Sequence, residues 1–113
     1  MSKQAMVVLS TAPDETLAAR LAGALVEGKL AACVNLVCDV RSVYWWDGAL
    51  QDDAEVLLIC KTDGERLDEL TRTLTELHPY DCPEVVAFRR WRPISTRRAS
   101  SWAMRNRNGL LSR

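Results

Sequence analysis

The sequence predicts one small α+β domain with the element order βαββαβ. Short apolar runs alternate with two longer segments of helical periodicity, and each half of the chain repeats the order strand, helix, strand. Between the halves lies the pair Asp47 and Gly48, which suits the positive φ angles of a tight hairpin turn. With 113 residues, 48% of them hydrophobic, the chain has the size and composition of one domain with its own core.

The first half begins with Ala5–Leu9, an apolar run long enough for a buried strand and too short for a helix. Thr11 and Asp14 have the spacing of a capping box, and an apolar stripe follows on a helix that we expect to end at Gly28. From residue 32 to residue 46 the chain alternates, with even-numbered residues on one face and odd-numbered residues on the other. This pattern predicts a long second strand.

The second half repeats the scheme. Val56–Cys60 is apolar on both faces, which is typical of a central strand. Thr62 and Glu65 repeat the capping-box spacing before a helix whose leucine stripe ends at Leu77. Residues 84–88 form the fourth expected strand.

Each half must cross over to place its two strands parallel, so the order predicts a ferredoxin-like antiparallel sheet with both helices on one face. Apolar residues then remain on the other face: Val34 or Val37, Val56 or Leu57, and the aromatic hairpin. Burying them requires self-association.

Charge divides the chain near Phe88. All 15 acidic residues and seven of the basic ones precede this point, for a net charge of −8, whereas residues 89–113 hold eight arginines and no acid. The sequence therefore predicts a domain over residues 1–88 and a separate arginine-rich segment over 89–113.

The four cysteines form no C-x-x-C pair, no apolar run has the length of a membrane span, and no signal-peptide pattern opens the chain. We therefore expect a cytoplasmic protein without a membrane partner.

Five segments in order resemble the CutA divalent-cation-tolerance family: TAPDE, KLAACVN, SVYWWDG, KT and HPYDCPE, which begin at Thr11, Lys29, Ser42, Lys61 and His78. The resemblance covers about residues 7 to 88. It implies a cytosolic homotrimer of ferredoxin-like subunits that acts in tolerance of divalent metals, with copper binding and without an assigned reaction. The resemblance also implies ligand sites between subunits, as in the similar trimers of PII signalling proteins.

The chain departs from the family pattern at three places. Some members have a cysteine where this chain has Ser10 and a second histidine where it has Leu77, so the copper ligands that the resemblance implies are largely missing. The segment after Phe88 also lacks the Tyr-Leu-x-Trp sequence of the family, since Ser100 and Ser101 precede Trp102.

The predicted metal ligands are His78 and Cys82, in a loop that also holds Asp81 and Glu84. Imidazole, thiolate and carboxylate within a few residues suit copper or another divalent cation. The spacing matches no standard site, and a histidine at a helix end also serves as a C-terminal cap, so both interpretations stay open.

The aromatic run Tyr44, Trp45 and Trp46 predicts a trimer interface. Alternation along a hairpin places one tryptophan in the core and the other between subunits. Stacking of a nucleic-acid base is the alternative interpretation, and the acidic surroundings argue against it.

A second hypothesis is a PII-like signalling module that binds a nucleotide or an anionic metabolite between subunits. Its anion contacts are Lys61, Tyr80 and Arg41, and Glu84 lines the same predicted cleft. Lys61 near an acid also has an ordinary interpretation as an interface ion pair. The single histidine, with no glycine-rich phosphate loop and no H-E-x-x-H, favours a protein that is not an enzyme.

Three interpretations of residues 89–113 are open. Arginines without acids attract phosphates, which is typical of a nucleic-acid arm. The segment also suits the acidic surface of a sister subunit. The third interpretation, which we favour, is a shifted reading frame, because the family resemblance and the acidic residues stop at the same point.

Overall fold

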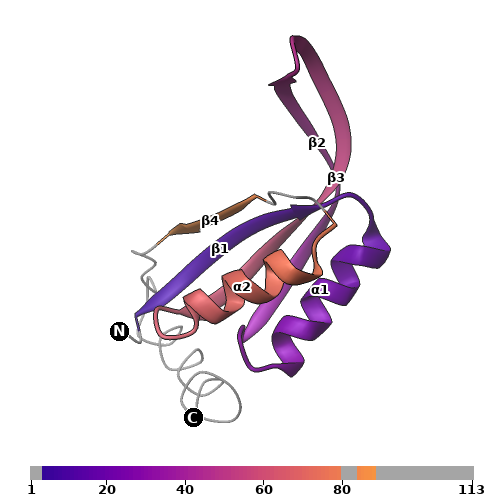
Figure 1. Ribbon diagram of the computed structural model, residues 1–113. Coiled ribbons are helices and arrows are strands. Elements are labelled where there is room, and N and C mark those ends of the chain that lie inside the picture. Colours follow the sequence, from indigo (N-terminus) through magenta and orange to yellow (C-terminus); the bar gives the residue numbers. More distant parts are fainter. Residues whose placement is uncertain (1–3, 80–83, 89–113) are drawn as a thin grey trace, which may run out of the picture.

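The computed structural model describes residues 4–79 and 84–88 of the chain (Figure 1). Two helices and four strands follow in the predicted order. The second and last strands and the ends of both helices lie within about one residue of the expected bounds, whereas the first and third strands extend beyond their apolar runs and the helix starts differ. The elements are β1 (Ala5–Ala12), α1 (Glu15–Glu27), β2 (Cys33–Trp46), β3 (Ala49–Asp63), α2 (Leu67–Leu77) and β4 (Val85–Phe88).

The sheet has the strand order β2-β3-β1-β4, and all neighbouring strands are antiparallel. Since β1 and β2 are both antiparallel to β3, which lies between them, they are parallel to each other, as the crossover through α1 requires. Both helices cover the same face of the sheet (Figure 1). The ferredoxin-like prediction is thereby confirmed, including the central place of the run Val56–Cys60 within β3.

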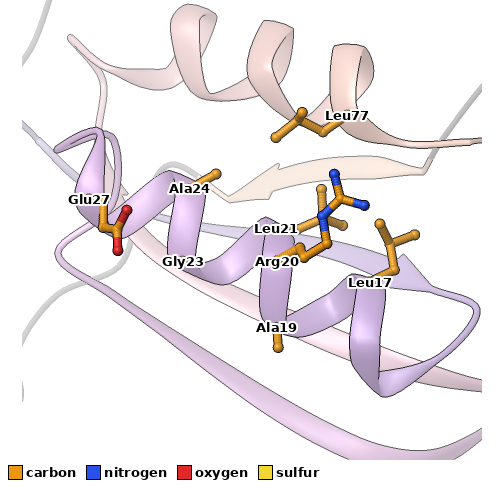
Figure 2. A pocket seen from close by; sticks show the side chains of 8 residues that line it. All are labelled: Leu17, Ala19, Arg20, Leu21, Gly23, Ala24, Glu27 and Leu77. Atoms are coloured by element: carbon orange, nitrogen blue, oxygen red, sulfur yellow. The ribbon is translucent and has the colours of Figure 1, made fainter.

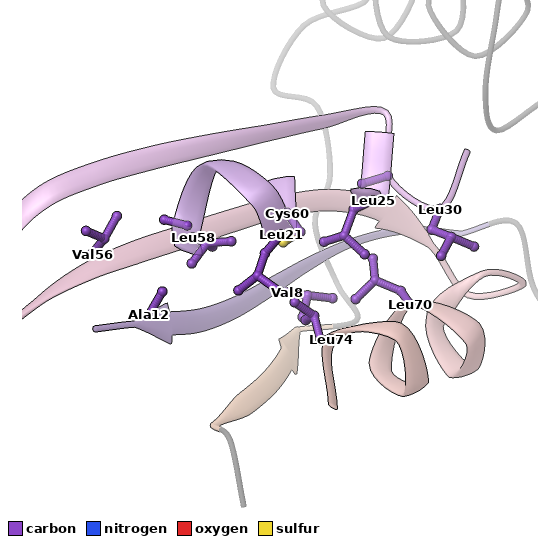
Figure 3. Close-up of a cluster of buried hydrophobic side chains, with 12 residues drawn as sticks. Val8, Ala12, Leu21, Leu25, Leu30, Val56, Leu58, Cys60, Leu70 and Leu74 are labelled. Carbon is purple, nitrogen blue, oxygen red and sulfur yellow. The ribbon is translucent and has the colours of Figure 1, made fainter. Parts of the chain in front are cut away.

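The core lies between the sheet and the two helices (Figure 3). Every second residue of β1 and of the second half of β3 is buried against the helices, as the two-residue period of a strand dictates. The helices contribute the leucines of their apolar stripes. The largest fully buried hydrophobic side chains are Val8, Leu21, Leu25, Leu58, Cys60, Leu70 and Leu74.

The start of α1 differs from the prediction. Asp14 is the N-cap, and its carboxylate accepts a hydrogen bond from the backbone N of Leu17 at 2.8 Å. Thr11, expected to cap the helix, belongs to β1 instead. The predicted spacing therefore identified the right segment and the wrong residue, because either side chain can accept such a bond.

The start of α2 was also wrongly predicted. Asp63 accepts hydrogen bonds from the backbone N atoms of Glu65 and Arg66 at 3.0 and 3.1 Å, and forms an ion pair with the Arg66 guanidinium at 2.9 Å. The Thr62 hydroxyl instead donates to the Leu30 carbonyl at 2.6 Å. The strand continues three residues further than its apolar run, to Asp63, and this shifts the helix start.

The alternation of β2 is interrupted at residues 38 and 39. Val37 pairs with Leu57 and Val40 with Glu55, so Cys38 and Asp39 together lie opposite one residue of β3. Asp39 has a φ of 61°, the left-handed conformation of a bulge residue. The prediction of one continuous alternation through Val40 is wrong beyond this bulge, because the extra residue exchanges the two faces of the strand.

Beyond the bulge, residues 40–55 form a hairpin that we call the arm. It extends from the two-layer body into solvent (Figure 1). The predicted turn is confirmed, with φ angles of 53° at Asp47 and 74° at Gly48.

Candidate functional site

His78 closes the C-terminal end of α2 and reaches back to β1. Its backbone N donates to the Leu74 carbonyl at 3.0 Å, and its ring Nε2 lies 2.7 Å from the Thr11 carbonyl oxygen. The ring is buried, with 6% of the residue exposed. Because a carbonyl oxygen only accepts, Nε2 carries the proton, and in the neutral ring the lone pair then lies on Nδ1.

Ser10 makes a matching contact on the other side of the predicted metal loop. Its buried hydroxyl donates to the backbone carbonyl of Glu84 at 2.6 Å. Consecutive residues of β1 thus contact residues 78 and 84, which are the two ends of the loop. Cys82, the second predicted ligand, lies outside the described residues, as do Asp81 and Tyr80. Within residues 4–79 and 84–88, no group of three or more His, Cys, Asp or Glu side chains is arranged to hold a metal ion.

Three cysteines of the described chain have different surroundings. Cys60 is fully buried in the core, and burial raises the pKa of its thiol to about 12. Cys33 is half-buried on the sheet face that the helices leave open, directly opposite Lys61. Cys38 is exposed at the bulge.

Two of the predicted anion contacts, Arg41 and Lys61, lie far apart in one chain. Arg41 forms an ion pair with Asp52 on the arm. Lys61 lies on the open sheet face, opposite Val7. It is seven residues along β3 from Ala54, which pairs with Arg41 across the sheet, so Lys61 and Arg41 are about 24 Å apart along the strand. Glu84 directly precedes β4. One chain does not bring these side chains together, and a cleft between subunits stays a prediction.

The arm exposes large apolar side chains on both of its faces. Trp45 is 70% exposed and shares a face with Val43 and Leu50, whereas Trp46 is 68% exposed on the opposite face with Tyr44. The prediction that one tryptophan enters the core is wrong for the single chain, because the arm extends beyond the layer that the helices cover. Leu50 and Val43 were not predicted as interface residues, although their places beside the turn and the aromatic run were visible in the sequence.

The open face of the sheet adds further apolar surface. Val37, Val86 and Phe88 are between 41% and 51% exposed. Val86 pairs with Leu9, and Phe88 with Val7, both on the face away from the helices. The expectation of an uncovered apolar face is therefore correct, with Val37 and Leu57 rather than Val34 and Val56 on it.

A shallow groove of about 370 Å³ lies between α1 and α2 (Figure 2). Leu17, Leu21 and Ala24 of α1 and Leu77 of α2 provide most of its apolar lining. Arg20 and Glu27 add one charge of each sign. In the described part of the chain, neither helix has both the length and the apolar character that crossing a membrane requires.

Known proteins share both the sequence and the fold of this chain. Protein CutA 1, chloroplastic, from Oryza sativa is 51% identical over 83 residues, which cover 74% of this chain and 47% of that protein. The divalent-cation tolerance protein CutA of Pectobacterium atrosepticum is 45% identical over 84 residues, 74% of this chain and 76% of that protein. The chain thus spans about half the length of the rice relative.

Solved structures agree with these relatives. CutA1 from Oryza sativa superimposes with a TM-score of 0.77 at 46% identity, over 81% of this chain and 86% of that one. The divalent cation tolerance protein from Thermus thermophilus gives a TM-score of 0.77 at 41% identity, over 87% and 93%.

The names of the relatives leave the location of this protein open. The rice relative is called chloroplastic, and a similar structure from Archaeoglobus fulgidus is called periplasmic, so a cytoplasmic location stays a prediction.

The domain boundary at Phe88 also stays a prediction. Residues 6–95 match the family described as CutA1 divalent ion tolerance protein. Together with the relatives and the fold, this match shows that the chain belongs to the CutA1 divalent ion tolerance protein family.

Proposed function

We propose that this protein acts in tolerance of divalent metal ions as a non-catalytic homotrimer. The observation that carries the proposal is the arm, whose Trp45 and Trp46 side chains are largely exposed in one chain. The proposed role in metal tolerance rests on membership of a family named for divalent ion tolerance.

The arm needs partners on two sides. A contact about a single two-fold axis covers one face of a hairpin, whereas Trp45 and Trp46 point to opposite faces and are both more than two thirds exposed. A closed ring of three subunits supplies two neighbours to every arm. The open sheet face around Val86 and Phe88 provides apolar surface for the same assembly.

Substitution on each face tests this proposal. Trp45→Ser and Trp46→Ser should each shift the protein from trimer toward monomer in light scattering coupled to size exclusion, because each removes an aromatic anchor. Val26→Ser, a change on the partly exposed surface of α1, is the matched control and should leave the trimer intact. A trimer that survives both tryptophan substitutions would contradict the role of the arm.

The metal part of the proposal assigns a weak copper or other divalent cation site to His78 and Cys82. The hydrogen bond from Nε2 to Thr11 supports it, because histidine ligands usually donate their second ring nitrogen to a carbonyl or carboxylate, which orients the ligating nitrogen. One imidazole and one thiolate form an incomplete set, so we expect weak binding unless neighbouring subunits contribute.

Calorimetry with copper tests the site. His78→Ala and Cys82→Ser should each weaken binding by about tenfold or more, the scale of a lost ligand contact. Cys38→Ser is the control, because that thiol is exposed and would bind copper adventitiously. Isotherms that change only for Cys38→Ser would exclude the loop. In a thermal-shift screen of the same protein, stabilisation by nucleotides and not by metals would favour the PII-like alternative.

A further inference from the structure

The outer face of α1 lies on the helix-covered side of the sheet, apart from the arm and the open sheet face (Figure 1). The residues of this face also line the α1 side of the groove toward α2, and they are mainly small residues with two charged residues among them (Figure 2). The small residues are Ala19, Gly23 and Ala24. The proposed arm contact therefore does not involve this face.

The two charges are opposite in sign and lie on the same side of the helix. Arg20 and Glu27 are seven residues apart, which is about two turns and about 10.5 Å along the axis. Both are exposed, and neither forms an ion pair with another described residue. Midway between them lie Gly23 and Ala24.

The fold of one chain gives no reason for glycine at position 23. An added Cβ would meet no atom within 4 Å, and φ there is not positive. Glycine inside a helix nevertheless lowers helix stability relative to alanine. A second helix that crosses α1 closely at this point would explain why no side chain is present.

We propose that α1 is a second self-association surface, on which two copies of this chain pair antiparallel about a two-fold axis near Gly23. Such a contact is self-complementary, since each Arg20 lies opposite the partner's Glu27, and each Glu27 opposite the partner's Arg20. The absence of a side chain at Gly23 lets the helix axes approach, and the ridge of each helix packs beside the other's groove. The surface is small, so the association is weak and salt-sensitive and joins chains or trimers beyond the arm-mediated assembly.

Sedimentation velocity over a range of protein concentrations tests this contact. The wild type should form a larger, concentration-dependent species at low ionic strength. Arg20→Glu and Glu27→Arg should each weaken it by roughly tenfold, because each replaces two attractive pairs by two repulsive ones. The double variant R20E/E27R restores the opposite charges and should recover the association.

Two further variants separate the contact from general charge effects. Gly23→Leu should abolish the larger species, and it adds a side chain into open space of its own chain. Arg72→Glu makes the same charge change as R20E on the exposed side of α2 and should have no effect. A wild type without a larger species, or a double variant that does not recover, would overturn the proposal. The arm-dependent trimer can be measured independently of this contact, since the substitutions at positions 20, 23, 27 and 72 all lie away from the arm.

Discussion

His78 can serve the fold and a candidate metal site through different atoms. Nε2 donates a hydrogen bond to the carbonyl oxygen of Thr11, 67 residues away in the sequence, and the lone pair of the neutral ring is on Nδ1. Nothing in the local spacing of residues 78–84 indicated this contact. The prediction of His78 as a ligand and its interpretation as a helix cap are therefore compatible.

Replacing His78 should separate these roles. His78→Ala should lower the free energy of unfolding by about 1–3 kcal/mol, because it leaves the Thr11 carbonyl without its partner. His78→Gln should lose less stability, since its amide N can still donate a hydrogen bond. Urea unfolding measures the free energy of unfolding of both variants. Equal stability of the alanine variant and the wild type would show that the hydrogen bond contributes nothing.

Cys60 gives the protein a defined response to alkaline pH. Burial raises the pKa of its thiol from 9.0 in the unfolded chain to about 12 in the folded protein. Between these values the unfolded state loses a proton that the folded state retains, so this contribution to stability is complete below about pH 9 and is lost as the pH rises toward about 12.

We expect the free energy of unfolding of the wild type to fall over that pH range. Denaturant titrations at several pH values measure this fall. Cys60→Ala should show a shallower fall, whatever its stability at neutral pH. Parallel curves for the two proteins would contradict the buried, protonated state of this thiol.

At the scale of the elements, the bulge at residues 38 and 39 determines which faces of the arm carry which side chains. An extra residue in one strand leaves no trace in composition, and its effect is visible only in the pairing with β3. The helix starts were misassigned for a related reason. Several polar residues near each strand end can cap a helix, and where the strand stops decides which one does.

Substitution at the bulge should test its conformation. Asp39→Val should destabilise the fold by about 1–2 kcal/mol, because a β-branched residue is strained at a φ of 61°. Asp39→Gly should be neutral or stabilising at the same position. Thermal unfolding compares the two variants. A valine variant as stable as the glycine variant would mean that residue 39 does not hold this conformation.

At the scale of the whole molecule, the sequence predicts the order of elements, the sheet and its uncovered face, because each depends on periodicities that local residues determine. The surroundings of Trp45 and Trp46 could not be predicted in this way. Whether a tryptophan of the arm is buried depends on how far the hairpin extends past the helices, and in this chain it extends beyond them. We therefore propose that the partner of the arm is another subunit.

The mass of the protein in solution tests the homotrimer most directly. Light scattering coupled to size exclusion should give three times the 12.7 kDa of one chain, independent of salt, since the arm contact is apolar. The weaker association through α1 should appear only at higher concentration and low salt. A mass of 12.7 kDa at every concentration would contradict the account, because the exposed tryptophans of the arm would then have no partner.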